Sequence, residues 1–160
     1  MPREMTSDEI EDLLEQQMVG RLGMIDGSVP YVVPISYAYR EGDVYAHSAQ
    51  GRKLSALRAR PEVCFEVDAV DALDRWRSVI AWGTYEQLLG GAAREGLDIL
   101  LERFRPATGA TGTEHPGAEL GMARVVDIPR MNTATLGRPD SAAAVFRIRL
   151  NIFTGRAEEL

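Results

Sequence analysis

The residues best suited to chemistry gather in one segment, VYAHSAQGRK, which covers residues 44–53. A histidine and a serine end an apolar run, and a glycine and two adjacent cations, Arg52 and Lys53, follow. The next residues, 54–60, predict a helix that stops at Pro61. Because the first N–H groups of a helix lack intrahelical acceptors and its dipole is positive there, the segment is typical of a site for an anion.

Four residues of this segment could contribute to such a site. Ser48 supplies a hydroxyl donor, Gly51 lets the backbone approach a ligand closely, and Arg52 and Lys53 supply positive charge. Two cations at a helix start are unfavourable unless an anion is present. The alternative is an ordinary helix start whose cations face solvent, and the segment alone does not decide between the two.

The overall charge narrows the class of ligand. The chain has a formal net charge of −6, so a local basic cluster favours a small anion and argues against nucleic acid or an anionic membrane surface. Its 160 residues suit one domain spanning 1–160. No apolar run approaches the roughly 20 residues of a membrane span, and the N-terminus lacks an apolar signal core, so we expect a cytoplasmic protein.

Predictions can also be made for three other residue types: histidine, cysteine and tryptophan. His47 ends a strand, where it either makes a structural hydrogen bond or contacts a ligand. Cys64, the one cysteine, is predicted to be a buried inert thiol, and no intramolecular disulfide is possible. His47 and His115 are far apart without a companion carboxylate pattern, which argues against a zinc site. Trp76 and Trp82 either line a pocket for a ring or belong to the core or an interface.

Apolar periodicity and turn residues predict the elements that position these groups. The predicted helices are 6–18, capped by Thr6 or Ser7 and ended by Gly20, then 52–60 and 92–104. The predicted strands are 21–25, 30–39, 44–47, 62–70, 77–89 and 144–152. Residues 106–139 are predicted to be a loop or insertion, and residues 154–156 a turn. Because Pro34 cannot donate a ladder hydrogen bond, it is expected at an edge or a bulge.

Consecutive strands joined by short turns favour an antiparallel sheet over a doubly wound parallel one. The predicted fold is therefore mainly β with minor α, a six-stranded antiparallel barrel with flanking helices.

Five short motifs then occur in a recognisable order. They are Pro-x-Ser-Tyr at 34–37, His-Ser-Ala at 47–49, Gly-x-Lys at 51–53, Val-Cys-Phe-Glu-Val at 63–67, and Trp-x-Ser-Val at 76–79 with a later glycine. Together they resemble the pyridoxamine-phosphate-oxidase-like FMN-binding split-barrel superfamily, and within it the nitroimidazole-resistance (Nim-type) flavoproteins. The resemblance covers residues 21–89 well and the remainder loosely.

The resemblance implies a homodimeric six-stranded split β-barrel with FMN at the subunit interface. Arg52 and Lys53 match the pair that binds the flavin phosphate, and His47 and Ser48 match the strand end facing the phosphate and ribityl chain. The strand bordering the flavin ring matches Val33, Pro34, Ile35 and Ser36. Ser78, with Val79 beside it, matches a position that reaches the flavin from the other subunit. In Nim-type proteins the strand-end histidine lies near substrate, which makes His47 the candidate catalytic residue.

The chain departs from the family pattern in two places. Residues 106–139 form a longer segment, richer in Gly and Thr, than the family pattern has. The C-terminal sequence RIRLNIFTGRAEEL lacks the basic, histidine-containing motif of true pyridoxamine-phosphate oxidases. The expected function is therefore an FMN-dependent oxidoreductase, such as a Nim-type nitroreductase, acting on a small molecule with a reduced nicotinamide as donor. The alternatives are the same fold with deazaflavin or haem, and a non-catalytic flavin-binding or sensing module.

Overall fold

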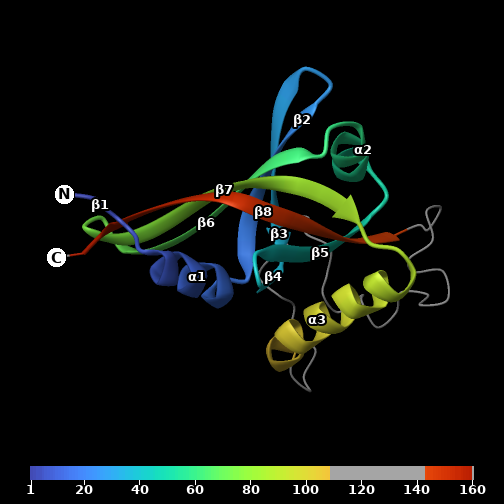
Figure 1. Ribbon diagram of the computed structural model, residues 1–160. Coiled ribbons are helices and arrows are strands. Elements are labelled where there is room, and N and C mark those ends of the chain that lie inside the picture. Colours follow the sequence, from blue (N-terminus) through green and yellow to red (C-terminus); the bar gives the residue numbers. More distant parts are fainter. Residues whose placement is uncertain (109–142, 160) are drawn as a thin grey trace.

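The computed structural model describes residues 1–108 and 143–159, with the side chains of 105–108 excepted. Within these residues, Figure 1 shows three helices set around one large twisted sheet. The elements in chain order are β1 (Arg3–Glu4), α1 (Ser7–Gln16), β2 (Val19–Asp26), β3 (Val29–Ser36), β4 (Ala38–Arg40), β5 (Asp43–Ala49), α2 (Arg52–Ala59), β6 (Glu62–Ala72), β7 (Arg75–Gln87), α3 (Gly90–Thr108) and β8 (Ala143–Glu158).

All strand pairs are antiparallel, and the order across the sheet is β3-β2-β6-β7-β8-β5-β4, with β1 added beside β8. Only Tyr37 separates β3 from β4, so the chain passes directly from one edge strand of the sheet to the other. The sheet therefore closes on itself at this corner. The predicted mainly β fold with an antiparallel sheet and flanking helices is confirmed.

The structure differs from the six predicted strands in its strand count. The described residues form eight strands, because the N-terminal β1 was not predicted and the run 30–39 divides into β3 and β4 at Tyr37. Tyr37 is fully buried, and its hydroxyl donates to the carbonyl oxygen of Leu14 at 2.7 Å. The buried hydrogen bond to α1 thus fixes a bend at Tyr37, although the apolar sequence pattern of residues 30–39 continues through this position.

The turn predicted at 154–156 is wrong, because β8 continues through it to Glu158 and pairs with β7. Gly155 is there for close packing: a Cβ atom at this position would lie 2.8 Å from side-chain atoms of both Met5 and Ile10. Gly20 is similar, since it lies inside β2 against the Phe65 ring and the first helix has already ended at Gln16. In both places glycine allows a neighbouring side chain to pack closely against the strand and does not mark a turn.

The third helix is longer than predicted and passes through Pro106 to Thr108. Residues 106–108 of the predicted loop are therefore helical. The remainder of that loop, with His115, lies outside the described residues.

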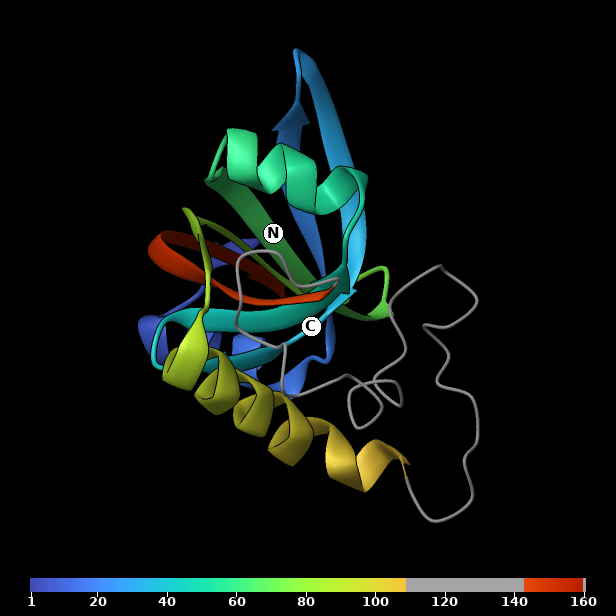
Figure 2. The ribbon, with the colours of Figure 1, turned by 90° about the vertical axis from the view of Figure 1, so that its right-hand side faces the viewer.

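The main core lies on the concave face of the sheet, and both α1 and α2 contribute to it. Helix α1 buries Ile10, Leu13 and Leu14, while α2 buries Leu54, Ala56 and Leu57. Helix α3 packs on the other face of β4, β5 and β8, where it forms a second, smaller core with residues such as Val145. Figure 2 shows α3 running beside β5 while α2 lies beside the β2–β3 hairpin. No helix in the described part of the chain is long and apolar enough to span a membrane.

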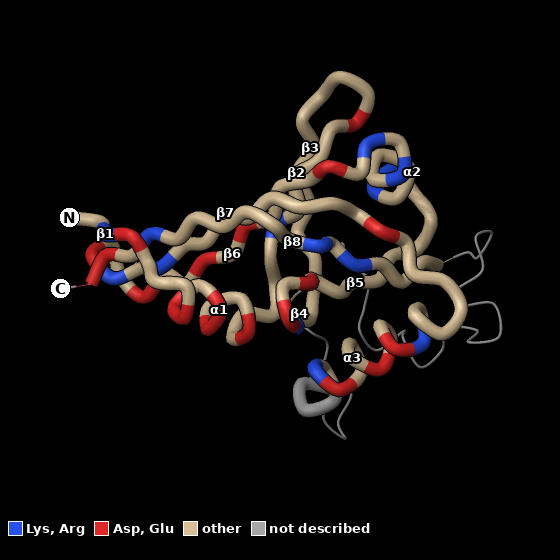
Figure 3. Tube along the Cα trace, in the orientation of Figure 1, with Lys and Arg blue, Asp and Glu red and all other residues tan. Residues whose placement is uncertain are grey.

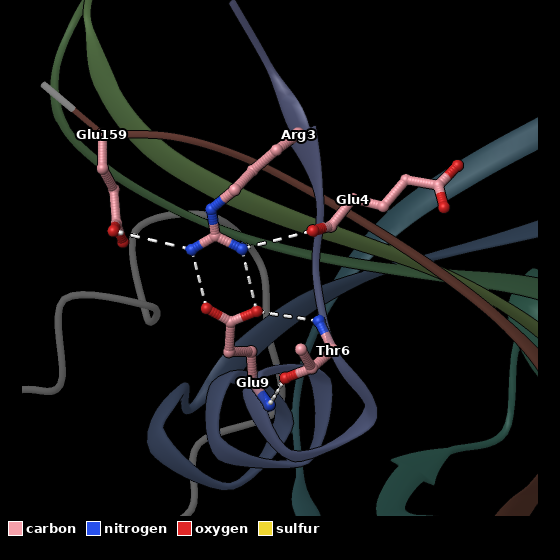
Figure 4. Close-up of polar contacts among 5 residues, drawn as sticks. All are labelled: Arg3, Glu4, Thr6, Glu9 and Glu159. Atoms are coloured by element: carbon pink, nitrogen blue, oxygen red, sulfur yellow. Dashed lines mark hydrogen bonds and ion pairs between the residues drawn. The ribbon is translucent and has the colours of Figure 1, made fainter.

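The first helix begins with the cap that the sequence predicts. The Thr6 hydroxyl accepts from the N–H of Glu9 at 3.3 Å, and the Glu9 carboxylate accepts from the N–H of Thr6 at 2.7 Å. Arg3 also holds that carboxylate, through two hydrogen bonds of 2.9 and 2.7 Å, and lies 3.6 Å from Glu159 (Figure 4). These contacts tie the start of α1 to both ends of the described chain.

Candidate functional site

The N-terminus of α2 has the features of an anion site. The helix follows β5 after two residues, and its N-cap, Gly51, provides no side-chain hydrogen bond to the first turn. Among the described residues, no acidic side chain occupies that first turn. The leading N–H groups therefore have no side-chain acceptor from the cap, and the positive end of the helix dipole is not offset. A Cβ atom at Gly51 would meet nothing within 4 Å, so the space beside the cap is open.

The two cations at this helix start are in different electrostatic states. Arg52 pairs with the Asp26 carboxylate and lies over the Tyr31 ring, 4.3 Å from its centroid. The hydrogen bond and charge of Asp26 raise the pKa of Arg52. Lys53 is half-buried and forms no hydrogen bond or ion pair within the described part of the chain. Burial lowers the pKa of Lys53, so this ammonium lacks the counter-charge that would compensate its desolvation.

Figure 3 shows the basic residues of α2 gathered beside the β2–β3 hairpin. Arg52 is already held by that hairpin through Asp26 and Tyr31. Lys53 is therefore the cation of this pair that remains available for an incoming anion.

His47 and Ser48 lie at the end of β5 but point to opposite faces, as consecutive strand residues must. Ser48 faces the main core and is 6% exposed, and its hydroxyl donates to the Ala49 carbonyl oxygen at 2.9 Å. His47 is half-buried, pairs across the sheet with Val145, and faces the side covered by α3. The structure therefore does not place the two side chains on one surface.

The four residues of β3 divide in the same way. Val33 and Ile35 pack toward the main core, whereas Pro34 and Ser36 face outward. Strand β3 is at the end of the sheet order, which confirms the edge position predicted from Pro34. Among the described residues, β3 pairs with β2 alone, so its second edge has no strand partner in that part of the chain.

Ser78 and Val79 on β7 also lie on opposite faces. Val79 is fully buried in the core, whereas Ser78 faces outward between Asp68 and Arg156 of the neighbouring strands. Ser78 lies six residues from Thr84, which pairs with the first residue of β6 next to α2. At about 3.3 Å per residue, that separation is about 20 Å. Within one subunit, Ser78 therefore lies about 20 Å along the sheet from the strand residue that follows α2.

The outer face of the sheet carries an apolar row that the sequence analysis missed. Cross-strand pairing aligns Val32, Gly23, Cys64, Trp82 and Ile152 on this face. Val32, Trp82 and Ile152 are 63%, 39% and 58% exposed. A signal was present, since β3 is apolar at both alternating positions, and such a strand is typical of a sheet covered on both faces.

A groove of about 410 Å³ crosses this row, with Val32, Cys64 and Trp82 in its lining. Gly23 also lines the groove, and because glycine has no side chain, nothing projects into the groove at that position of the row. Cys64 is only half-buried there, which corrects the prediction of a buried thiol. Its pKa is raised by burial first and by the Glu66 charge second, so the thiol stays protonated at neutral pH.

The two tryptophans do not share a pocket. Trp82 lines the apolar groove, whereas Trp76 lines a cavity of about 140 Å³ near the β6–β7 turn, with Asp71, Arg75 and Arg77 among its neighbours. Among the described residues, no group of three or more His, Cys, Asp or Glu side chains could hold a metal ion.

Known proteins share this architecture. The family model described as pyridoxamine 5'-phosphate oxidase matches residues 6–138. An uncharacterized protein of Rhizobium meliloti is 29% identical over 86 residues, which cover 54% of this chain and 57% of that protein. The chain thus spans little more than half the length of that curated relative.

Among solved structures, a FAD-binding protein of Mesorhizobium loti is similar with a TM-score of 0.72 and 26% identity, and the match covers 99% of both chains. A putative 5-nitroimidazole antibiotic resistance protein of Bacteroides thetaiotaomicron has a TM-score of 0.67 and 20% identity, with 99% of this chain and 92% of that one covered. The second likeness is one of fold alone.

Proposed function

Because this chain belongs to the pyridoxamine 5'-phosphate oxidase family, we propose that it is an FMN-dependent oxidoreductase whose flavin phosphate binds at the N-terminus of α2. One observation carries the proposal. Lys53 is a half-buried cation without a counter-ion in the described structure, at a helix start that has no side-chain cap. A phosphate would supply both missing interactions, the counter-charge and the acceptor for the leading N–H groups.

The residues around α2 fit a phosphate ester. Lys53 would contact the phosphate directly, while Arg52, held over Tyr31 by Asp26, would add positive potential beside it. The Ser48 hydroxyl now donates to the Ala49 carbonyl, so it would have to rotate to donate to the ligand.

The rest of the flavin would lie along the edge of β3 that no strand in the described part of the chain covers. The backbone of Val33–Ser36 would border its ring, with Pro34 leaving one position without an N–H group. His47, on the face covered by α3, is the residue proposed to lie near substrate. Bound flavin supplies the redox chemistry, while the protein orients it and limits access to it.

The proposed reaction class is electron transfer from a reduced nicotinamide to a small organic acceptor. Nitro compounds are the acceptors proposed first, because the structural relatives include a protein described as a putative nitroimidazole resistance protein. That relative shares only the fold at 20% identity, so the acceptor is a finer proposal than the flavin.

We also propose that the protein is a homodimer whose partner covers the apolar row on the outer face. Val32 and Ile152 are more than half exposed, and the row continues over five strands. Exposed apolar surface of this kind is a typical protein interface. A second copy would also bring its own Ser78 toward the flavin.

The visible spectrum of the purified protein, with the mass of the released chromophore, tests the cofactor. Flavin absorption with the mass of FMN supports the proposal. The mass of FAD would support a flavin site but would show that the cofactor is FAD and not FMN. A deazaflavin or haem spectrum would contradict it. The proposed activity is tested separately, by reduction with NADH or NADPH followed by a nitro compound or quinone. Tightly bound FMN without turnover would indicate a flavin-binding or sensing module.

A further inference from the structure

One side chain, Arg58, bridges two glutamines at the end of the barrel that α2 covers. Its Nε and Nη2 atoms donate to Oε1 of Gln87, at 3.1 and 2.9 Å, and its Nη1 atom donates to Oε1 of Gln50 at 2.8 Å. Gln87 is the last residue of β7, and Gln50 belongs to the two-residue connection between β5 and α2. A single guanidinium thus ties that connection to the sheet.

The Gly51 half of this connection has no side chain that could hold it in place. Gly51 has no side chain to pack, and a Cβ atom there would meet nothing within 4 Å. The N-cap makes no side-chain hydrogen bond to the helix. A planar guanidinium holds several acceptors in fixed directions, which a flexible lysine ammonium does not do. The Arg58 bridge therefore restrains the backbone that leads into the first turn of α2.

The guanidinium of Arg58 also retains its charge without neutralisation by a carboxylate. Its three hydrogen bonds within the described residues go to neutral amide oxygens. Tyr85 lies close by and is 8% exposed; burial raises the pKa of this phenol, and the charge of Arg58 opposes the rise. The Tyr85 hydroxyl itself has no hydrogen bond of good geometry in the described structure. Among the described residues, Arg58 therefore has amide oxygens and no carboxylate as hydrogen-bond acceptors.

We propose that Arg58 is a positioning residue for the anion end of the site. Through Gln50 and Gln87 it fixes the turn that directs the first N–H groups of α2, and Lys53 beside them, at a phosphate. This inference rests on the proposed function, because it requires a flavin whose phosphate binds at that helix start. It does not require Arg58 to touch the ligand.

Riboflavin, which lacks the phosphate, provides the test. Dissociation constants for FMN and riboflavin are measured on the full chain freed of flavin, for the parent protein, Arg58→Lys and Gln87→Ala. The matched control is Arg60→Lys, because Arg60 is exposed, lies two residues further on, and forms no hydrogen bond or ion pair through its side chain within the described residues. Thermal unfolding of each variant checks that the fold is retained.

Loss of the bridge should lower the preference for FMN over riboflavin by at least about fivefold in both Arg58→Lys and Gln87→Ala, as expected for a lost hydrogen-bonded restraint. Riboflavin binding should not change, and Arg60→Lys should behave as the parent. Retention of the full preference by both variants would overturn the inference while leaving the proposed function intact. Equal loss of both ligands would also overturn it, because that pattern indicates a general structural role. A parent protein without any preference for FMN would contradict the phosphate site itself.

Discussion

Adjacent residues of the same charge have different roles at the start of α2. Arg52 is paired with Asp26, whereas Lys53 is half-buried without a partner in the described structure. Desolvation of an unpaired ammonium disfavours its charged form, so Lys53 lowers the stability of the unliganded fold. A destabilising charge of this kind is typical of a functional residue, because a ligand that pairs with the charge removes the destabilisation.

The lowered pKa of Lys53 predicts a pH dependence for FMN binding. Since burial lowers the pKa of Lys53 below the usual 10.5, the free protein loses this charge at a lower pH than an exposed lysine would. The FMN phosphate stays doubly charged above about pH 7, because its second pKa is near 6. The affinity for FMN should therefore fall as the pH rises through the lowered pKa of Lys53.

Fluorescence titration between pH 7 and the usual lysine pKa checks this, with Lys53→Arg as the comparison because arginine stays charged throughout. Riboflavin binding in the same buffers corrects for titration of the flavin ring. Identical pH profiles for FMN in both proteins would contradict the assignment.

The stability of the unliganded fold should change with pH in the opposite direction to the FMN affinity. Between the lowered and the usual pKa the unfolded chain binds more protons, so stability should rise with pH in that window.

At the scale of elements, the cap of α1 predicts a stability change with acid. The Arg3 hydrogen bonds, and next the Thr6 backbone N–H, lower the pKa of Glu9 to about 2 from 4.5. A lowered carboxyl pKa gives stability that is present above pH 4.5 and is lost as the pH falls through about 2. Glu9→Gln should therefore destabilise the fold at pH 7, and the difference should shrink as the pH falls from 4.5 toward 2.

Urea unfolding at several pH values measures this difference. Thr6→Ala removes the other half of the capping box and should lower the free energy of unfolding by about 1 kcal/mol at pH 7. Asp8→Asn is the control, because Asp8 is also acidic and in the first turn but takes no part in the box. An effect of Asp8→Asn equal to that of Glu9→Gln would attribute the stability to the helix dipole and not to the specific contacts.

Local sequence signals were sufficient for most elements but not for their ends. The cap at Thr6 and the edge position of Pro34 follow from chemistry within a few residues, and both are confirmed. The break at Tyr37 and the continuation of β8 through Gly155 depend on contacts with α1 and on β7 pairing that are distant in sequence. Glycine occurs both in turns and where two elements pack closely, so its presence in the sequence does not distinguish the two.

At the scale of the whole molecule, the outer apolar row predicts the oligomeric state. Trp82→Glu places a charge within the apolar row of the proposed interface, so it should convert a dimer to a monomer in light scattering. Leu89→Glu is the control, because Leu89 is 45% exposed, similar to Trp82, but lies between β7 and α3 and outside the row. A monomeric parent protein that retains bound FMN would contradict the homodimer and the shared site.

The site itself could be only partly predicted. The anion end could be proposed from Arg52 and Lys53, because all the residues involved are neighbours in sequence. The different states of these cations were not evident, since Asp26 and Tyr31 come from another hairpin. Likewise, no local signal shows that Ser78 lies far from α2, because that distance depends on strand register.

The most direct test of the central claim is the effect of Lys53→Ala on flavin affinity. A charge-assisted contact to phosphate contributes about 1.5–3 kcal/mol, so this change should weaken FMN binding by at least about tenfold. Riboflavin binding should stay within about twofold of the parent, because that ligand has no phosphate. Unchanged FMN affinity in the Lys53→Ala protein would contradict a phosphate site at the start of α2.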